Sequence, residues 1–286
     1  MASWNATTRI STEMTRSAAE AQTLQEFEVS YARMRAPVMT AIERSVCGCD
    51  YGGTSWTTRE EADRIGEALG LARGKLLLEV GAGSGWPALY LAKQSGCSAI
   101  LTDLPEEGLR LARERAAADG LADRCRIVQA DGTKLPVDDA SVDAISHSDV
   151  LCCLTDKLGV LAECRRTIRS RGRMAFPVIF VAAGLSRQDH ADAVAAGPPF
   201  VEAEGDYPTL LARTGWRVVE AADLTATFIK STRAMLEARE AHRKELKALL
   251  GEGEYDDMIA RNREKIPAVE RGLLRRVLFI AEPKSA

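Results

Sequence analysis

Apolar runs of strand length alternate with amphipathic stretches of helix length through the middle of this 286-residue chain. Short apolar runs predict strands, and apolar positions three or four residues apart predict helices between them. Parallel strands need long crossover connections, so this alternation predicts a parallel sheet with helices on both faces. The predicted strands are 75–80, 98–102, 126–130, 142–146 and 173–181, and the predicted helices between them are 86–94, 105–119 and 156–169.

The segments before this region read mainly as helical. Residues 1–46 favour helix, most strongly over 18–39, and the glycines after Cys47 mark a loop. Thr58-Arg59-Glu60-Glu61 matches a capping box, which predicts a helix from there to Gly70. We therefore expect N-terminal helices and a cofactor-closing loop over 1–56, followed by a cofactor-binding core over 57–183.

The remaining segment, 184–286, has a different pattern. Residues 184–208 lack a clear period and predict an insertion or lid. Strands are expected at 216–221 and 275–281, with one long helix at 224–250 and another at 255–271. The predicted fold class is α/β: a Rossmann-like, doubly wound, seven-stranded sheet. It would be mostly parallel with an antiparallel last strand, carrying N-terminal helices and a helical lid.

Charge and composition narrow the function classes. The net charge is −3 and acids alternate with bases, so no basic footprint for nucleic acid is present in the sequence. No apolar run approaches the roughly 20 residues of a membrane span. The polar start, without an apolar leader, predicts a cytoplasmic protein. Seven scattered cysteines without a CxxC pair predict reduced, buried thiols and no metal site. A monomer or a homodimer is expected.

Three predicted strand ends carry residues suited to a ligand. The first is followed by glycines at 81, 83 and 85, which allow a tight turn and close approach of the backbone. Asp103 follows the second strand, where a carboxylate can accept hydrogen bonds from ribose hydroxyls. Asp131 and Gly132 follow the third, where an acid can accept from an adenine amino group. Ligands bind at the carboxyl ends of strands in such sheets.

The loop fits S-adenosylmethionine better than a dinucleotide. A dinucleotide fingerprint places a third glycine where this chain has Trp86, and it has no use for Glu79 at the first strand end. S-adenosylmethionine carries an ammonium and a sulfonium instead of a pyrophosphate, so an acid before the loop suits it. The sequence therefore predicts S-adenosylmethionine as cofactor.

These segments resemble the class I S-adenosylmethionine-dependent methyltransferases. Residues 77–85, 101–104, 129–132 and 142–146 are similar to their cofactor motifs. The resemblance implies that Leu104 packs against adenine and that Ser146 belongs to the cofactor site. Segment 148–157 and the Asp223-Leu224-Thr225 run resemble phosphoethanolamine, sterol and tocopherol methyltransferases, which implies a small-molecule acceptor. Cys153 stands where a histidine helps catalysis in the phosphoethanolamine enzymes.

Methyl transfer to a hydroxyl or an ammonium requires a proton acceptor near the nucleophile. His147 and Asp149 follow the fourth predicted strand and are the candidates; a structural role for each remains open. Tyr51 and Trp56 before the first strand, Cys153, and Tyr207 in the lid segment are candidate acceptor contacts. Packing roles are the alternatives for these four.

Two other functions remain open at this stage. The chain could bind S-adenosylmethionine without transferring its methyl group. It could also methylate a thiol or a metalloid through Cys152 and Cys153, although two small apolar residues starting a helix explain that pair as well.

Overall fold

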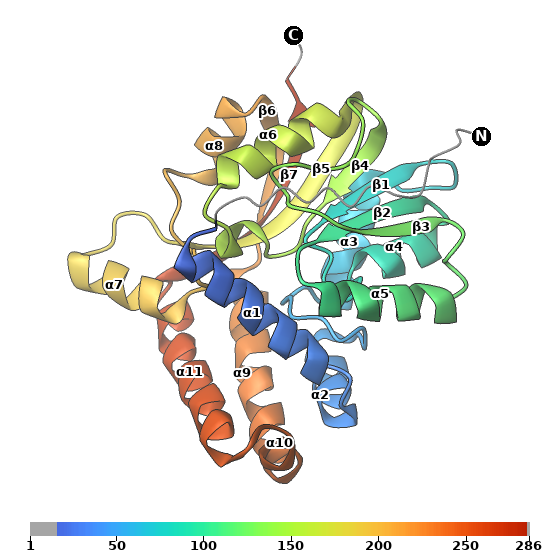
Figure 1. Ribbon diagram of the computed structural model, residues 1–286. Coiled ribbons are helices and arrows are strands. Elements are labelled where there is room, and N and C mark those ends of the chain that lie inside the picture. Colours follow the sequence, from blue (N-terminus) through green and yellow to red (C-terminus); the bar gives the residue numbers. More distant parts are fainter. Residues whose placement is uncertain (1–15, 285–286) are drawn as a thin grey trace.

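The computed structural model describes residues 16–284 and contains one seven-stranded sheet in the order β3-β2-β1-β4-β5-β7-β6 (Figure 1). Strands β1 to β5 are parallel to one another, and β7 runs antiparallel to both β5 and β6. The predicted fold class is confirmed. The strands are β1 Leu76–Val80, β2 Ser98–Asp103, β3 Cys125–Gln129, β4 Val142–Ser146, β5 Ile168–Val181, β6 Trp216–Asp223 and β7 Leu274–Pro283.

Alternation along the strands creates two cores, one on each face of the sheet. Leu77 packs in a cluster with α3 (Arg59–Leu69), α4 (Ala88–Ser95) and α5 (Glu106–Ala118). Leu78, the next residue, packs in a cluster with α6 (Lys157–Thr167) and α8 (Tyr207–Arg213). Successive strand residues point to opposite faces, so each face of β1 is covered by its own set of helices.

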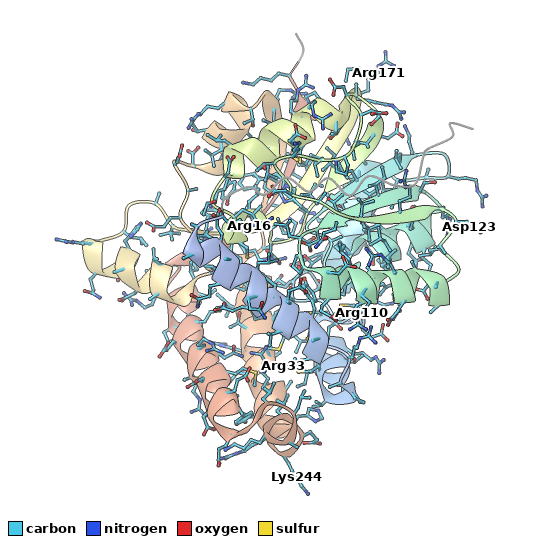
Figure 2. The ribbon with its side chains drawn as sticks, in the orientation of Figure 1. Arg16, Arg33, Arg110, Asp123, Arg171 and Lys244 are labelled. Atoms are coloured by element: carbon cyan, nitrogen blue, oxygen red, sulfur yellow. The ribbon has the colours of Figure 1, made fainter. Side chains whose placement is uncertain are left out.

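A third cluster lies away from the sheet, in a helical layer formed by both ends of the chain (Figure 1). Its members come from α2 (Pro37–Cys47), α9 (Thr225–Ala241), α10 (Arg243–Leu250) and α11 (Glu252–Glu270). Helix α1 (Ala18–Arg33) crosses in front of this layer, and an Arg33–Glu254 ion pair joins it to α11. Charged side chains cover the outer surfaces, including Lys244 at the tip of α10 (Figure 2).

Local signals explain the ends of several elements. Thr58 accepts a hydrogen bond from the Glu61 backbone N–H, and the Glu61 carboxylate accepts from the Thr58 N–H, which confirms the predicted capping box. Helix α2 begins at Pro37, whose missing N–H costs nothing in the first helical turn. The region in which helix was most strongly expected, 18–39, contains α1 and the first turn of α2. Residues 1–15 of the expected N-terminal helical region lie outside the described residues.

Segment 184–208, predicted as an insertion or lid without a clear period, contains helix α7 (Arg187–Ala196), capped by Ser186, and only Ala193 in it is fully buried, so its sequence shows no apolar period. One prediction for the tail was wrong. The expected helix over 224–250 is broken at His242 (φ −97°, ψ 26°), which separates α9 from α10. That break lets Leu246 pack between α2 and α11.

Strand β5 begins at Ile168, before the expected start at residue 173, and its pairing with β4 shifts register between Val142 and Ala144. The early start includes Gly172, where a β-carbon would collide with Ile168. Over residues 16–284, no helix is both long and apolar enough to cross a membrane.

Leu246 and Leu249 on α10 provide a matched test of the helical layer. Leu246 is fully buried, and Leu249 is 38% exposed. Leu246→Ala is expected to lower the free energy of unfolding by about 2–5 kcal/mol, because it opens a cavity, whereas Leu249→Ala changes it by about 0.5 kcal/mol or less. Urea denaturation measures both. Equal effects would show that the layer does not pack as described.

Candidate active site

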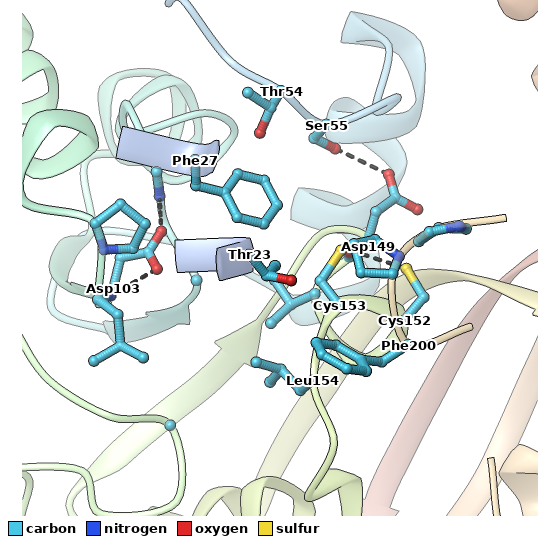
Figure 3. Close-up of a pocket in the computed structure, with 18 of the residues that line it drawn as sticks. Thr23, Phe27, Thr54, Ser55, Asp103, Asp149, Cys152, Cys153, Leu154 and Phe200 are labelled. Carbon is cyan, nitrogen blue, oxygen red and sulfur yellow. Dashed lines mark hydrogen bonds between the residues drawn. The ribbon is translucent and has the colours of Figure 1, made fainter. Parts of the chain in front are cut away.

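A cavity of about 380 Å³ opens at the carboxyl ends of the parallel strands. Gly81 follows β1, Asp103 ends β2, Asp131 follows β3 and Asp149 follows β4, so four neighbouring strands contribute to one wall. Figure 3 shows Asp103 at one side of the cavity, Asp149 and the two cysteines at the other, and Phe27 between them. The predicted site residues in the wall are Trp56, Gly81, Gly83, Asp103, Leu104, Asp131, Gly132, Asp149 and Cys153.

The glycine loop is tied to the end of β2. The Asp103 carboxylate accepts hydrogen bonds from the Gly83 N–H (2.6 Å) and the Leu104 N–H (2.7 Å). Gly81 and Gly83 have φ values of 70° and 50°, which favour glycine. Burial raises the pKa of Asp103 to about 6. A polar ligand that donates to this carboxylate would offset the burial.

The third strand end also presents a carboxylate. One oxygen of Asp131 accepts from the Thr133 backbone N–H (2.9 Å) and hydroxyl (2.7 Å). Its other oxygen lies 3.9 Å from the Arg16 guanidinium, a loose contact with a half-exposed side chain. The second oxygen of Asp131 therefore has only a loose contact with Arg16, and a ligand could replace that contact.

Helix α1 covers the cavity, which the sequence analysis did not predict. Phe27 and Tyr31 line the wall, and the Tyr31 hydroxyl lies 3.1 Å from the Thr54 hydroxyl. A β-carbon on Gly83 would collide with that Tyr31 hydroxyl. The spacing of Phe27 and Tyr31 on one helix face could have suggested a shared contact, but nothing in the pattern indicates what they cover. Other α1 residues in the wall are Glu20, Thr23 and Leu24.

Two hydroxyls in the wall lack partners among the described residues. The side-chain oxygens of Ser84 and Ser148 are buried and make no hydrogen bond there. Buried hydroxyls are normally satisfied by protein, water or ligand. The wall therefore suits a ligand with polar groups.

Asp149 is held in a buried ionic network. Its carboxylate accepts from Arg276 Nε (2.8 Å) and Nη2 (3.0 Å), and it also accepts from the Ser55 hydroxyl and the Trp56 N–H. Arg276, on β7, is fully buried and bonds Glu61 of α3 through Nη1 as well. Asp149 itself has a positive φ of 57°. These contacts position Asp149 and occupy its oxygens.

Glu79 and Ser146 lie beneath the wall and do not line the cavity. They are neighbours across β1 and β4, and the Ser146 hydroxyl donates to Glu79. Burial raises the pKa of Glu79 to about 8, and its second oxygen has no partner among the described residues. Gly85 is also outside the wall, packed on Leu89. Direct cofactor contacts by these three residues remain predictions.

His147 does not line the cavity. It is fully buried and stacks on Phe176, with 4.3 Å between ring centroids, and neither ring nitrogen has a partner among the described residues. Burial lowers its pKa to about 3. A base needs access to the proton it takes, so this position gives no support to the predicted catalytic role.

The candidate acceptor contacts divide in two. Trp56 and Cys153 line the cavity, together with Phe200. Tyr51 instead packs on Trp86, and Tyr207 packs among Phe176, Phe180 and Phe279 in the core, so packing explains both. Cavity residues that the sequence analysis missed include Thr54, Ser55, Ile179, Pro198, Pro199 and Lys265.

The thiol pair offers little reactivity. A hydrogen bond with Cys153 and burial raise the pKa of the Cys152 thiol well above its usual value. Both sulfur atoms lie near the Asp149 carbonyl oxygen, at 3.1 and 3.6 Å. Residues 16–284 contain no group of three or more His, Cys, Asp and Glu side chains placed to hold a metal ion.

Arg276→Met is expected to lower the free energy of unfolding by about 3–5 kcal/mol, because it leaves two buried carboxylates without their cation. Arg275→Met is the control, since the Arg275–Asp223 pair is half-exposed, and it should cost about 1 kcal/mol or less. Chemical denaturation measures both variants. Similar small losses would contradict a structural role for the network.

His147 predicts a pH dependence of stability. Its pKa in the folded protein lies below the ordinary value of 6.5, so its contribution is present above pH 6.5 and is lost as the pH falls toward 3. His147→Phe should flatten the slope of unfolding free energy between pH 6.5 and 4 by up to about 1.4 kcal/mol per pH unit. The exposed His190→Phe is the control. An unchanged slope in His147→Phe would overturn this.

Comparison with known proteins agrees with this geometry. Residues 78–176 match the family model described as a methyltransferase domain. Methyltransferase GfsG of Streptomyces halstedii is 31% identical over 169 residues, covering 57% of this chain and 60% of that protein. The 27-O-demethylrifamycin SV methyltransferase of Amycolatopsis mediterranei is 29% identical, covering 59% and 65%. The chain thus spans less than two thirds of either relative.

A solved structure shares the fold. Phosphoethanolamine N-methyltransferase 2 of Haemonchus contortus, in complex with phosphomonomethylethanolamine and S-adenosylhomocysteine, superposes with a TM-score of 0.72. The identity is 16%, and the match covers 91% of this chain and 61% of that one. The family match identifies a methyltransferase domain over residues 78–176, and the relatives and the shared fold support a class I S-adenosylmethionine-dependent methyltransferase.

Proposed function

We propose that this protein transfers the methyl group of S-adenosylmethionine to a small-molecule acceptor inside the cavity. One observation carries the proposal. The strand-end residues suited to the cofactor and a second, largely apolar group of residues line the same continuous space. Donor and acceptor held in one enclosed space can meet in line, which supplies much of the rate of such a displacement.

The cofactor end would be the side of the cavity formed after β1, β2 and β3. Asp103 would accept from ribose hydroxyls and Asp131 from the adenine amino group, and Leu104 would pack against the base. Gly81 and Gly83 leave room for the backbone to approach the methionine part. The bound cofactor supplies an electrophilic methyl group. The two unpartnered hydroxyls of Ser84 and Ser148 support a polar ligand here.

The acceptor end would be the side formed after β4 and β5. Trp56, Cys153 and Phe200 offer an apolar surface there, and α1 closes the cavity from outside. These residues would exclude water and orient the acceptor. The names of the relatives, which include a 27-O-demethylrifamycin SV methyltransferase and a phosphoethanolamine N-methyltransferase, support a small-molecule acceptor.

Proton removal would not depend on a free carboxylate in the wall. At the acceptor end, the Asp149 carboxylate accepts hydrogen bonds from Arg276, Ser55 and Trp56, so its oxygens are already occupied by the protein. We assign Asp149 as a positioning residue that holds Trp56 in place. This arrangement suits an acceptor that needs no strong base, such as a neutral amine, which attacks through its lone pair and loses a proton only after methylation, or an acidic hydroxyl, which is already ionised.

Asp103→Ala is expected to weaken binding of S-adenosylhomocysteine by about tenfold or more, because a charge-assisted hydrogen bond contributes about 1.5–3 kcal/mol. Asp123→Ala, an exposed acid in the α5–β3 loop, is the control and should bind as the wild type does. Isothermal titration calorimetry measures both.

Activity is tested with cofactor carrying a labelled methyl group and a panel of amines, phenols, carboxylic acids and thiols. Transfer to at least one acceptor is expected. Binding without transfer to any of them would favour a non-methylating role. No binding of either cofactor form by the wild type would contradict the proposed function altogether.

A further inference from the structure

Lys265 is a charged residue of the cavity wall that the proposed function does not use. It extends from α11 and is half-buried in the wall. Its ammonium lies 5.4 Å from the centroid of the Trp56 ring. In residues 16–284, no carboxylate forms an ion pair with it. Lys247 on α10, by contrast, pairs with Glu252 (2.7 Å) and Asp256 (3.3 Å).

A second cation lies near Lys265 and adds to the positive charge there. Arg239 on α9 bonds the amide oxygen of Asn262 (2.9 Å), and it too forms no ion pair within the described chain. Burial and the charge of Arg239 lower the pKa of Lys265. Asp149 is the acid close enough to favour the Lys265 ammonium, but its oxygens are bonded to Arg276, Ser55 and Trp56. Among residues 16–284, neither Lys265 nor Arg239 is therefore paired with a carboxylate.

The Trp56 ring holds the Lys265 ammonium in position. Its ring packs edge-on against Phe228 at 5.3 Å, and its backbone N–H donates to Asp149 at 3.1 Å. The ring face attracts a cation, so it orients the ammonium without consuming its hydrogen bonds. All three N–H donors of Lys265 remain available to a ligand. Phe200 and Ile179 supply apolar wall in the same cavity.

A cation taken out of water is normally paired, and among residues 16–284 the protein provides no anionic partner for Lys265. We propose that the methyl acceptor is a small molecule with an apolar body and a carboxylate or phosphate group, and that Lys265 binds this anionic group beside Trp56. The anion would fix the far end of the acceptor, so that its nucleophile points toward the cofactor end. This assignment rests on the proposed function, because it names the substrate class of that same cavity.

The test uses three probes that share a phenyl ring: benzoate, phenyl phosphate and neutral benzamide. Each is titrated by calorimetry into full-length protein saturated with S-adenosylhomocysteine. The wild type is expected to bind at least one of the two anions about tenfold or more tightly than benzamide. Which anion binds more tightly separates a carboxylate acceptor from a phosphate acceptor.

Three variants test whether Lys265 causes the preference for the anionic probes. Lys265→Met removes the charge and should abolish the preference for the anion, whereas Lys265→Arg keeps the charge and should retain most of it. Lys230→Met removes an exposed lysine of α9 and should behave as the wild type does. All three should bind S-adenosylhomocysteine as the wild type does, which reports an intact fold and donor site.

Two results would overturn the assignment: wild-type protein that binds benzamide as well as both anions, or Lys265→Met protein that keeps the anion preference. Failure of the proposed function is a different result, because it is loss of S-adenosylhomocysteine binding in the wild type.

Discussion

The buried Arg276 guanidinium, shared by Glu61 and Asp149, is the interaction on which the site depends. It joins strand β7, the first turn of α3 and the loop after β4. Thr57 adds a fourth segment, because its hydroxyl oxygen accepts a 3.1 Å hydrogen bond from Nη2 of Arg276. Buried charges are costly unless paired and fully hydrogen-bonded. Because the partners come from four separate segments, the network forms only when the sheet and the N-terminal loop are both in place, and it then holds Trp56 and Asp149 at the cavity.

The network also explains why the acids at the strand ends, Asp103, Asp131 and Asp149, have different roles. Asp103 and Asp131 keep contacts with backbone N–H groups and a loose cation, and these can be shared with a ligand. The Asp149 carboxylate accepts hydrogen bonds from the buried Arg276 guanidinium, so its oxygens are occupied by the protein. Three acids at three strand ends of one sheet edge thus differ in their availability to a ligand, and their hydrogen-bond partners distinguish them.

The sheet and its cofactor loop could be predicted from the sequence because their signals are local. Alternating apolar residues define each strand, and Gly81, Gly83 and the Thr58 capping box follow from backbone requirements that need no distant partner. The helix α7 could not be predicted from its period, since Ala193 is its one fully buried residue. The break at His242 follows from long-range packing of Leu246 on α2, which no local pattern contains.

The site was predictable only where it lies on the sheet. His147 and Tyr207 are typical of site residues by position, yet the sequence could not show that Phe176 covers both. Phe27, Tyr31 and Lys265 reach the cavity from helices at opposite ends of the chain, and their place depends on how α1 and α11 pack over the strand ends (Figure 1). The acceptor end is built largely from such distant residues, and for this reason the donor was easier to infer than the acceptor.

The most direct test of the account is a crystal structure of the protein with S-adenosylhomocysteine. The account predicts the ribose at Asp103, the adenine between Leu104 and Asp131, and the sulfur atom facing the space between Trp56, Cys153 and Lys265. A ligand bound elsewhere, or one whose sulfur faces away from that space, would contradict the claim that donor and acceptor share this cavity.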